Sequence, residues 1–387
     1  MRKRKITLVC GNIYGFGGGV RWTMEVYKRL RKKYDVTILN ITCPMDDIRF
    51  SRKELFRQYD LEGDVIDIDC FAVRASVPGA YSFPLFIPKN MPRLIKLLGK
   101  ADIIYSENPN PLISVAEVLA SKIYKRKLVY GVFSPLIGKV FSIREDAGLV
   151  DKAYLTASRF LVRNFKHIHV FSKEDYDTMH RNFPEARIYL IPNFTYFSPS
   201  KITSSPRFNA LFMGRLEKYQ KGLDILSDAL DMIINEEKQF NLTIAGAKGD
   251  GEYIVRDIVK RFPNNVKWKG FLWGKELERT FSDANLLMFP SRLETLPLSI
   301  TEAKTFGIPV VAFDVRGPKQ LVKNGVEGRL VKPFDTRVFA DAVLSYFGSW
   351  KKNRAAYSKM KEKIARAAAQ DYDPEATIRN IESMLKD

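Results

Sequence analysis

Charged residues in the second half of the chain carry the clearest chemistry. Arg215 and Lys221 stand between an apolar run that ends at Gly214 and a helical pattern that begins with "GLDIL". Two cations beside a helix N-terminus suit a diphosphate, because both donate charge-assisted hydrogen bonds to phosphate oxygens. The alternative is a pair of surface cations in a basic protein.

Two carboxylates stand at the next junction of this kind. The apolar run "NLLMFP" ends, a short loop carries Glu294, Pro297 stands at or near the first helical position, and Glu302 lies on the helix that follows. Backbone N–H groups around Leu296 to Ser299 then have no intrahelical acceptors and predict a phosphate site. Because carboxylates accept hydrogen bonds from hydroxyls, the whole set suits a sugar joined to a nucleotide diphosphate.

Parallel strands would bring both junctions to one edge of a sheet, and the sequence pattern predicts such sheets. Short apolar, β-branched runs alternate with helical patterns from "KITLVC" to "RIYLIP", and the alternation restarts at "NALFMG". Residues 193–208, between the two series, are rich in Ser and Pro and predict a linker. We therefore expect an α/β protein with two Rossmann-like, doubly wound parallel-sheet domains that face a cleft.

Residues 210–333 resemble the donor-binding half of a retaining glycosyltransferase with the GT-B fold, of the large family whose signature is E-x7-E (glycosyltransferase family 4, glycosyl transferases group 1). The signature is Glu294 to Glu302 here, and the segments "GRLEKYQKG", "LTIAGAKGDGEYI" and "TFGIPVVAFDVRGPKQLVKNGVEGRLVKP" follow the family's order. With this fold we expect an acceptor-binding domain over residues 1–194, a linker over 195–206, a nucleotide-sugar-binding domain over 207–370, and a C-terminal helix over 371–387 that packs back on the first domain.

The resemblance also implies roles for the site residues. Arg215 and Lys221 bind the donor diphosphate and stabilise charge on the leaving group, and Glu294, the third catalytic candidate, contacts the transferred sugar. A nucleotide-diphosphate sugar is the expected donor, UDP-sugar first and GDP-sugar second, with retention at the anomeric carbon and with no metal or cofactor. Further expected donor contacts are Gly246, Gly270, Phe271, Thr295, Leu296, Pro297, Leu298 and, on the ribose hydroxyls, Glu302.

The glycine turn "GNIYGFGGGV", residues 11–20, follows the first predicted strand. It fails the spacing of a dinucleotide fingerprint, because Val20 takes the third small position and the second strand ends in Asn40 instead of an acid. Its family counterpart is the N-terminal glycine loop, which implies that Gly17 and Gly18 approach the donor. Glu107, after the strand "ADIIY", is a candidate contact for the acceptor or the sugar, with a plain loop carboxylate as the alternative.

Phe133 departs from the family pattern, which often has a histidine in the strand that matches "LVYGVFSP". Phe133 takes that place as a weak candidate contact for sugar or acceptor, whereas His167 and His169 are expected to be structural. The leading hypothesis is transfer of a hexose to a hydroxyl acceptor such as a lipid-linked or cell-envelope glycan. Two alternatives remain open, a catalytically silent GT-B module that binds a partner and a GT-B sugar-nucleotide epimerase.

Composition limits the remaining classes. The chain has 387 residues, 45% of them apolar, and its three cysteines lack the spacing of a zinc site. No run reaches the roughly 18 to 20 apolar residues of a membrane-spanning helix, so we expect a cytoplasmic protein. A net charge of +19, basic runs at 27–34 and 121–127, and the aromatic stretch 77–98 suit peripheral contact with the anionic inner face of a membrane, with solvated helix faces as the alternative. No nucleic-acid partner is expected, because no binding module accompanies the charge.

Overall fold

The structure is a computed structural model, and it divides the chain into two compact units. Unit 1 consists of Met1–Pro192 together with Glu375–Asp387, and unit 2 consists of Asn193–Pro374. The described residues are 2–15, 17–43, 51–61, 63–75, 83–107, 110–132, 156–157, 160–197, 199, 202, 205–294 and 297–387.

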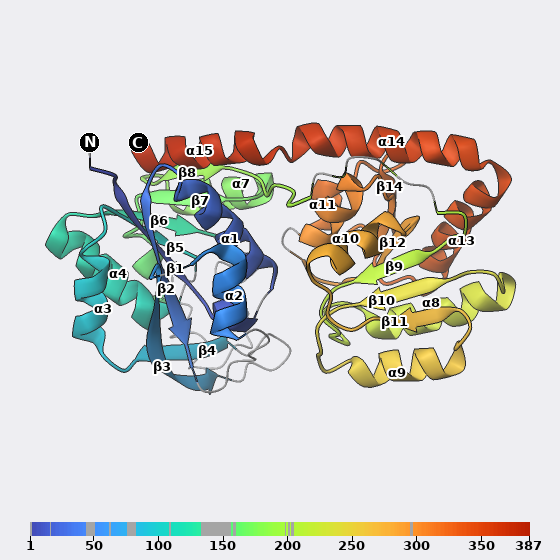
Figure 1. Cartoon of the computed structure of the whole chain (residues 1–387), viewed down its shortest axis with the longest axis horizontal. Helices are drawn as coiled ribbons and strands as arrows, with labels where there is room; N and C mark the ends of the chain where they lie inside the picture. The colour runs from blue at the N-terminus through green and yellow to red at the C-terminus, as the bar shows by residue number, and fades with distance from the viewer. Residues whose placement is uncertain are drawn as a thin grey trace. The chain divides into compact units, whose positions relative to one another are not determined.

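Unit 1 is built on one eight-stranded sheet with the order β4-β3-β2-β1-β5-β6-β7-β8 (Figure 1). All neighbours pair in parallel except β3 and β4. The strands are β1 (Lys5–Cys10), β2 (Asp35–Thr42), β3 (Val65–Ala75), β4 (Phe83–Pro88), β5 (Ile103–Ser106), β6 (Lys127–Gly131), β7 (His167–Val170) and β8 (Arg187–Leu190). The helices are α1 (Gly18–Leu30), α2 (Arg52–Tyr59), α3 (Met91–Leu98), α4 (Pro111–Tyr124), α7 (Lys173–Asn182) and α15 (Pro374–Lys386).

Helix α1 is amphipathic. Met24, Tyr27 and Leu30 recur on one face and are buried, whereas Lys28 and Lys32 face solvent. The basic residues of this segment therefore lie on the outer face of unit 1.

Two elements of unit 1 were absent from the sequence expectation. Helix α2 is short and mostly exposed, and a capping box between Ser51 and Glu54 marks its start. Strand β4 pairs antiparallel with β3 and is formed by part of the aromatic stretch 77–98. Tyr81, in the same stretch, lies outside the described residues.

Unit 2 contains a six-stranded, all-parallel sheet with the order β11-β10-β9-β12-β13-β14. Its strands are β9 (Ala210–Met213), β10 (Leu242–Ala245), β11 (Val266–Trp268), β12 (Leu286–Phe289), β13 (Val310–Phe313) and β14 (Gly328–Val331). Its helices are α8 (Leu223–Glu236), α9 (Glu252–Arg261), α10 (Gly274–Ser282), α11 (Leu298–Thr305), α12 (Pro318–Leu321), α13 (Thr336–Lys352) and α14 (Arg354–Asp371). Among the helices described in either unit, none combines the length and apolar character needed to cross a bilayer.

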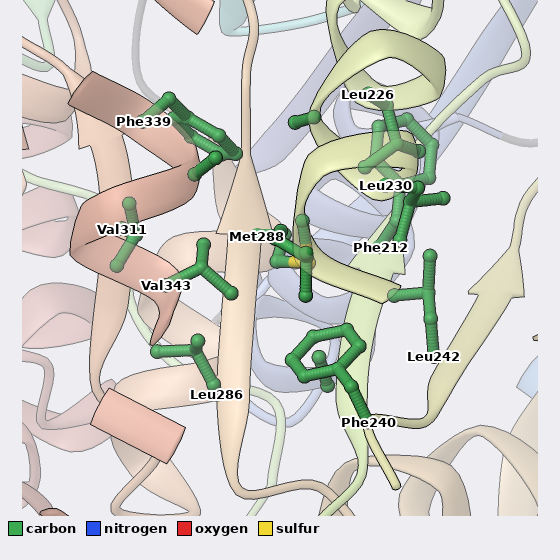
Figure 2. Close-up of a cluster of buried hydrophobic side chains, with 14 of the residues drawn as sticks. Phe212, Leu226, Leu230, Phe240, Leu242, Leu286, Met288, Val311, Phe339 and Val343 are labelled. Carbon is green, nitrogen blue, oxygen red and sulfur yellow. The ribbon is translucent and has the colours of Figure 1, made fainter. Parts of the chain in front are cut away.

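Both faces of the unit 2 sheet are buried, as parallel sheets require. Phe212 and Met288 point to the cluster shown in Figure 2, where Leu230 of α8 and Phe339 of α13 pack against them. Leu211, the neighbour of Phe212 in β9, belongs instead to the core on the opposite face. Each buried leucine or phenylalanine side chain contributes about 1.5–3 kcal/mol, so this core holds the strand ends in place.

The last helix, α15, belongs to unit 1. Its Ile381 and Met384 are buried, Glu382 forms an ion pair with Lys33 at 2.8 Å, and Lys127 Nζ donates to Met384 O at 2.6 Å. The end of the chain therefore completes the first folding unit.

Candidate active site

The candidate site lies at the carboxyl edge of the unit 2 sheet, where the strand order reverses. The chain runs outward from β9 to β10 and β11, and then returns to place β12 on the other side of β9. The carboxyl ends of β9 and β12 therefore form a topological switch point, which is the usual ligand position in an open α/β sheet. Arg215 and Lys221 follow β9, and Glu294 follows β12.

Glycines bring the backbone close together on one side of this edge. Gly246, after β10, has a φ of +157°, and a Cβ atom there would lie 1.6 Å from Gly214 O. Its N–H donates to Gly270 O at 2.7 Å, and Gly270 itself has a φ of +69°. Two of the predicted donor contacts, Gly246 and Gly270, thus meet directly.

The loop after β9 is fastened to the loop after β12 by backbone contacts. Gly222 adopts a φ of +67°, and a Cβ there would lie 2.1 Å from Pro290 O. Arg292 N donates to Gln220 O at 2.8 Å, and Gln220 Nε2 donates to Leu293 O at 3.0 Å. The two loops therefore act as one structural element.

Arg292 strengthens this connection with its side chain. Its guanidinium makes two 2.8 Å bonds to the Asp224 carboxylate and one 2.9 Å bond to Tyr219 O. Burial would raise the pKa of Asp224, but the bonds from Arg292 and from the backbone hold that pKa below its usual value. The contact of Arg292 with Asp224 was not predicted from the sequence, although the position of Arg292, two residues before Glu294, was a signal that could have suggested it.

Lys221 and Glu294 meet across the joined loops. Lys221 Nζ lies 2.5 Å from Glu294 Oε1, and the two side chains are only 13% and 9% exposed. Gly214 also borders this pair, since a Cβ atom at that position would lie 3.5 Å from Cδ of Lys221. The structure thus brings together a cation and a carboxylate that the sequence analysis assigned to one site.

Arg215 takes a different position from Lys221. Its guanidinium lies 3.0 Å from Glu217 Oε1, and the side chain is 53% exposed. Arg215 stands at the correct sheet edge but does not join the Lys221–Glu294 pair. Its exposure leaves the guanidinium accessible to a ligand.

Helix α11 supplies the remaining predicted contacts. Pro297 is its N-cap, one position earlier than the first helical residue, and Leu298 begins the helix. The first N–H groups of such a helix have no intrahelical acceptor and favour an anion. Glu302 lies on the same helix and is buried. Thr295 and Leu296 lie outside the described residues.

Phe271 lies apart from that helix, next to Gly270 after β11. Its ring is 39% exposed, which leaves an aromatic face accessible at this edge of the sheet. Within the described part of the chain, no group of three or more His, Cys, Asp or Glu side chains is placed to hold a metal ion.

Unit 1 has its own switch point, between β1 and β5. Gly17 is the N-cap of α1 and Gly18 is its first residue. Neither has a positive φ, and a Cβ at Gly17 would meet no atom within 4 Å. The turn before them is fixed by Asn40, whose Oδ1 accepts from Ile13 N at 2.9 Å and whose Nδ2 donates to Asp67 at 2.8 Å. Asn40 therefore serves the fold at the position where a dinucleotide site needs an acid.

Glu107 follows β5 and contacts Thr23 of α1. Thr23 Oγ1 lies 2.5 Å from Glu107 Oε2 and 3.0 Å from Gly19 O. Burial raises the pKa of Glu107 to about 8, with the hydrogen bond to Thr23 acting in the opposite direction. Oε1 of Glu107 is shielded from solvent and finds no hydrogen-bond partner in the described part of the chain. Thr23 was not anticipated from sequence, since it lies 84 residues away.

The histidines are placed as structural residues. His169 is buried, and its ring nitrogens contact Tyr105 Oη at 2.7 Å and Ile191 O at 2.8 Å. Burial lowers the pKa of His169 to about 4, so the ring is neutral. His167 contacts Tyr189 Oη at 3.1 Å. Phe133 lies outside the described residues.

Comparisons with known proteins cover both halves of the chain. A family model described as Glycosyltransferase Family 4 matches residues 16–195, and one described as Glycosyl transferases group 1 matches residues 198–387. An uncharacterized 41.2 kDa protein from the cps region of Klebsiella pneumoniae is 32% identical over 125 residues, which are 32% of this chain and 33% of that protein. The chain thus matches about a third of that relative's length.

Two longer matches extend along the chain. The amylovoran biosynthesis glycosyltransferase AmsD of Erwinia amylovora is 24% identical over 324 residues, covering 77% of this chain and 84% of that protein. The crystal structure of Anabaena HepE in complex with UDP-glucose superposes with a TM-score of 0.74 at 20% identity and covers 99% of both chains. This structural likeness confirms the predicted fold class.

Proposed function

Because the chain belongs to glycosyltransferase family 4, with the group 1 glycosyl transferase model over its second half and the GT-B fold, we propose that it transfers a hexose from a nucleotide-diphosphate sugar to a hydroxyl acceptor with retention of the anomeric configuration. The observation that carries the proposal is the Lys221–Glu294 pair at the switch point of unit 2. Since the cation and the carboxylate lie 2.5 Å apart, they can contact adjacent parts of one donor molecule. The cation would bind phosphate and the carboxylate would bind the sugar.

The diphosphate is the part of the donor for which this edge is best equipped. Lys221 and the exposed Arg215 supply two positive charges, and the first turn of α11 supplies backbone N–H groups. Cations fixed before the reaction stabilise negative charge as it develops on the leaving diphosphate. In this proposal they perform that task without a metal ion.

The sugar and the nucleoside take the remaining positions. Glu294 exchanges its bond with Lys221 for hydroxyls of the hexose, Glu302 holds the ribose, and the exposed Phe271 lies along the base. UDP is the first choice of nucleotide and GDP the second. The UDP and UDP-glucose complexes of HepE support that order.

The proposed acceptor is a hydroxyl of a lipid-linked or cell-envelope glycan. Relatives named for amylovoran and colanic acid biosynthesis support a polysaccharide context. Glu107 is the proposed contact for the acceptor hydroxyl, because a neutral carboxylic acid can both donate and accept a hydrogen bond. We include peripheral binding to the inner face of a membrane in the proposal, on the basis of the net charge of +19.

A donor screen tests the proposal most directly. The full chain is incubated with a panel of nucleotide sugars, and the retained ligand is identified by mass spectrometry. We expect a UDP-sugar. Calorimetry with that donor then compares the wild type with Arg215→Ala and Lys221→Ala, and with Lys260→Ala, an exposed cation on α9, as the control with equal loss of charge.

The outcomes separate the alternatives. Weaker binding in the two site variants and unchanged binding in the control would support the donor site. Equal binding in all four proteins would show that the donor site is misassigned. Slow donor hydrolysis in the absence of acceptor, lost in Glu294→Ala, would exclude a catalytically silent module. An epimerase would instead release an altered sugar from the donor.

A further inference from the structure

The amino edge of the unit 1 sheet, opposite to the edge that carries Glu107, gathers positive charge. Lys5, Lys127 and Arg187 are the first residues of β1, β6 and β8, and Asp35, the first residue of β2, lies 3.8 Å from the ammonium group of Lys5. The start and the end of the described chain also meet at this edge, as the N and C marks in Figure 1 show. Segments that are far apart in the sequence therefore converge on one part of unit 1.

A hollow of about 450 Å³ opens between these segments. Residues 2–4, residues 125–127 and the end of α15 form its walls, with Asp102 and Ile103 between them. Seven basic side chains and two acidic ones line it. The volume is in the range of small-molecule sites, which commonly measure about 300–1,000 Å³.

The two acidic residues of the hollow already have partners. Asp102 accepts from Lys5 N at 2.8 Å and lies 3.7 Å from Arg126. Asp387 accepts from Tyr189 Oη at 3.3 Å. By contrast, five of the basic side chains form no ion pair with any described residue, namely Arg2, Lys3, Arg4, Lys125 and Lys386. The hollow therefore keeps a surplus of positive charge.

Burial is the main cause of the pKa shifts of two neighbouring groups, and nearby cations add to it. Burial, followed by the charges of Lys127 and Arg187, lowers the pKa of His167 to about 4. Burial also lowers the pKa of Lys127, where Arg4 and Arg187 act in the same direction and Asp387 opposes them. A bound anion would relieve this repulsion.

Lys125 adds an exposed side chain to the rim of the hollow. It ends α4 in the left-handed region, with a φ of +53°. Helices commonly end in this way, as α2 does at Asp60, and glycine or asparagine is the favoured residue there.

The other basic run of unit 1 is paired to a larger extent. In residues 27–34, Arg29 pairs with Glu25, Arg31 with Asp60 and Lys33 with Glu382, while Lys28 and Lys32 face solvent. Of the seven cations of the hollow, Arg126 pairs with Asp102 and Lys127 donates to Met384 O. The other five form no ion pair with a described residue.

We propose that this hollow binds an anion with two or more phosphate groups, carried either by a soluble molecule or by a lipid headgroup. Several cations that converge from three segments select a polyanion over a single charge. The site belongs to unit 1 and to the amino edge of its sheet, whereas the donor site belongs to the carboxyl edge of the unit 2 sheet. The two assignments therefore stand or fall separately.

The test compares three full-length proteins. The edge variant combines Arg2→Gln, Arg4→Gln and Lys125→Gly, and the control variant combines Lys260→Gln, Lys359→Gln and Lys363→Gln, exposed cations of unit 2. Both lose three charges. Because glycine relieves the positive φ at position 125, the edge variant should melt no lower than the wild type, and unfolding cannot account for a loss of binding.

Two probes distinguish the sources of the phosphate. Tripolyphosphate is titrated by calorimetry at physiological salt, and flotation is measured with phosphatidylcholine vesicles that contain cardiolipin, a lipid with two phosphate groups. For a soluble ligand, we expect about a tenfold or larger rise in the Kd of tripolyphosphate in the edge variant and less than about a twofold rise in the control. For a lipid headgroup, we expect flotation to fall in the edge variant alone.

Either of these results supports the proposal and assigns the source. Equal losses in the edge and control variants would overturn it, because they would reflect net charge and not the hollow. Wild-type protein that binds neither probe would overturn it as well, as would binding of both probes that the edge variant leaves unchanged.

Discussion

The two units place a carboxylate at the same topological position and treat it in opposite ways. Glu294 follows β12 and meets Lys221, whereas Glu107 follows β5 and meets Thr23. In unit 2 the partner is a cation, so the carboxylate belongs to an ion pair. In unit 1 the partner is a hydroxyl, and burial raises the pKa of Glu107 to about 8. One topology thus supports a charged site in one unit and a neutral site in the other.

Thr23 Oγ1 lies within hydrogen-bond distance of two acceptors, Gly19 O and Glu107 Oε2. A hydroxyl has one proton, so it donates to one of them at a time. The bond that Thr23 donates to Glu107 lowers the pKa of that carboxyl, and burial, the larger effect, raises it. The difference between the units is therefore set by the partner residue and by burial, and not by the strand order.

The largest expected effect comes from breaking the charged pair. Lys221→Ala removes the cation that we propose binds the donor diphosphate, and we expect kcat to fall about 10²–10³-fold, as when a preorganised oxyanion donor is removed. It also leaves the Glu294 charge largely buried without its partner, which is destabilising. Steady-state transfer kinetics with the donor identified by the screen measure the first effect. Lys221→Met combined with Glu294→Gln, which restores stability but not activity, separates it from the second.

The next effect concerns the close approach of Gly246 to Gly214 in unit 2. Gly246→Ala places a methyl group at the position that lies 1.6 Å from Gly214 O, at a φ of +157°. The backbone must shift, and we expect a loss of about 2–4 kcal/mol in the unfolding free energy of unit 2. Thermal and urea unfolding measure the loss. A stable variant with normal donor binding would show that the close approach of the two glycines is dispensable.

A smaller effect tests the neutral carboxylate of unit 1. The pKa of Glu107 is about 8 in the folded protein and near 4.5 in the unfolded chain. At a pH between these two values, the carboxyl group therefore takes up a proton when the chain folds. The stability from this group is complete below about pH 4.5 and falls as pH rises to about 8, by about 1.4 kcal/mol per pH unit.

Glu107→Gln should remove this dependence on pH. Glu117, another buried carboxyl whose pKa is raised to about 8, contributes a second slope of the same sign. We therefore expect Glu107→Gln to reduce the pH slope of unfolding without abolishing it. Urea unfolding at a series of pH values measures both slopes, and an unchanged slope in Glu107→Gln would mean that the carboxyl is ionised in the folded protein.

The smallest effect is expected in the glycine turn of unit 1. Gly17 has an extended backbone, and a Cβ there meets no atom within 4 Å. We expect Gly17→Ala to change stability by less than about 0.5 kcal/mol, in contrast to Gly246→Ala. A fall in turnover with unchanged stability would support ligand approach at this turn. Unchanged turnover would remove Gly17 from the site.

The arrangement of Lys221 and Glu294 was accessible from sequence because it depends on the order of strands. Each follows an apolar run, and parallel strands deliver their carboxyl ends to one edge. The β3–β4 pairing was missed because Phe83–Pro88 contains two prolines, which usually argue against a strand. The edge position of β4 tolerates them.

The contacts that hold the site depend on loop geometry, which the sequence pattern does not report. Arg292 reaches Asp224 across 68 residues, and Gly222 is required because Pro290 O occupies the space of a Cβ. The Glu107–Thr23 contact likewise joins a loop to a helix through the fold alone. Residue types at strand ends indicated the chemistry of the site, whereas the contacts that hold those residues in place are visible only in the structure.

The return of α15 to unit 1 limits how this protein can be divided. A fragment that stops near Pro192 would leave the partners of Ile381 and Met384 exposed, and a fragment that starts near Asn193 would carry α15 with its apolar face uncovered. Exchange of donor specificity between relatives by domain grafting would thus need two junctions, one near residue 193 and one near residue 374. Chimaeras with a single crossover would be prone to aggregate.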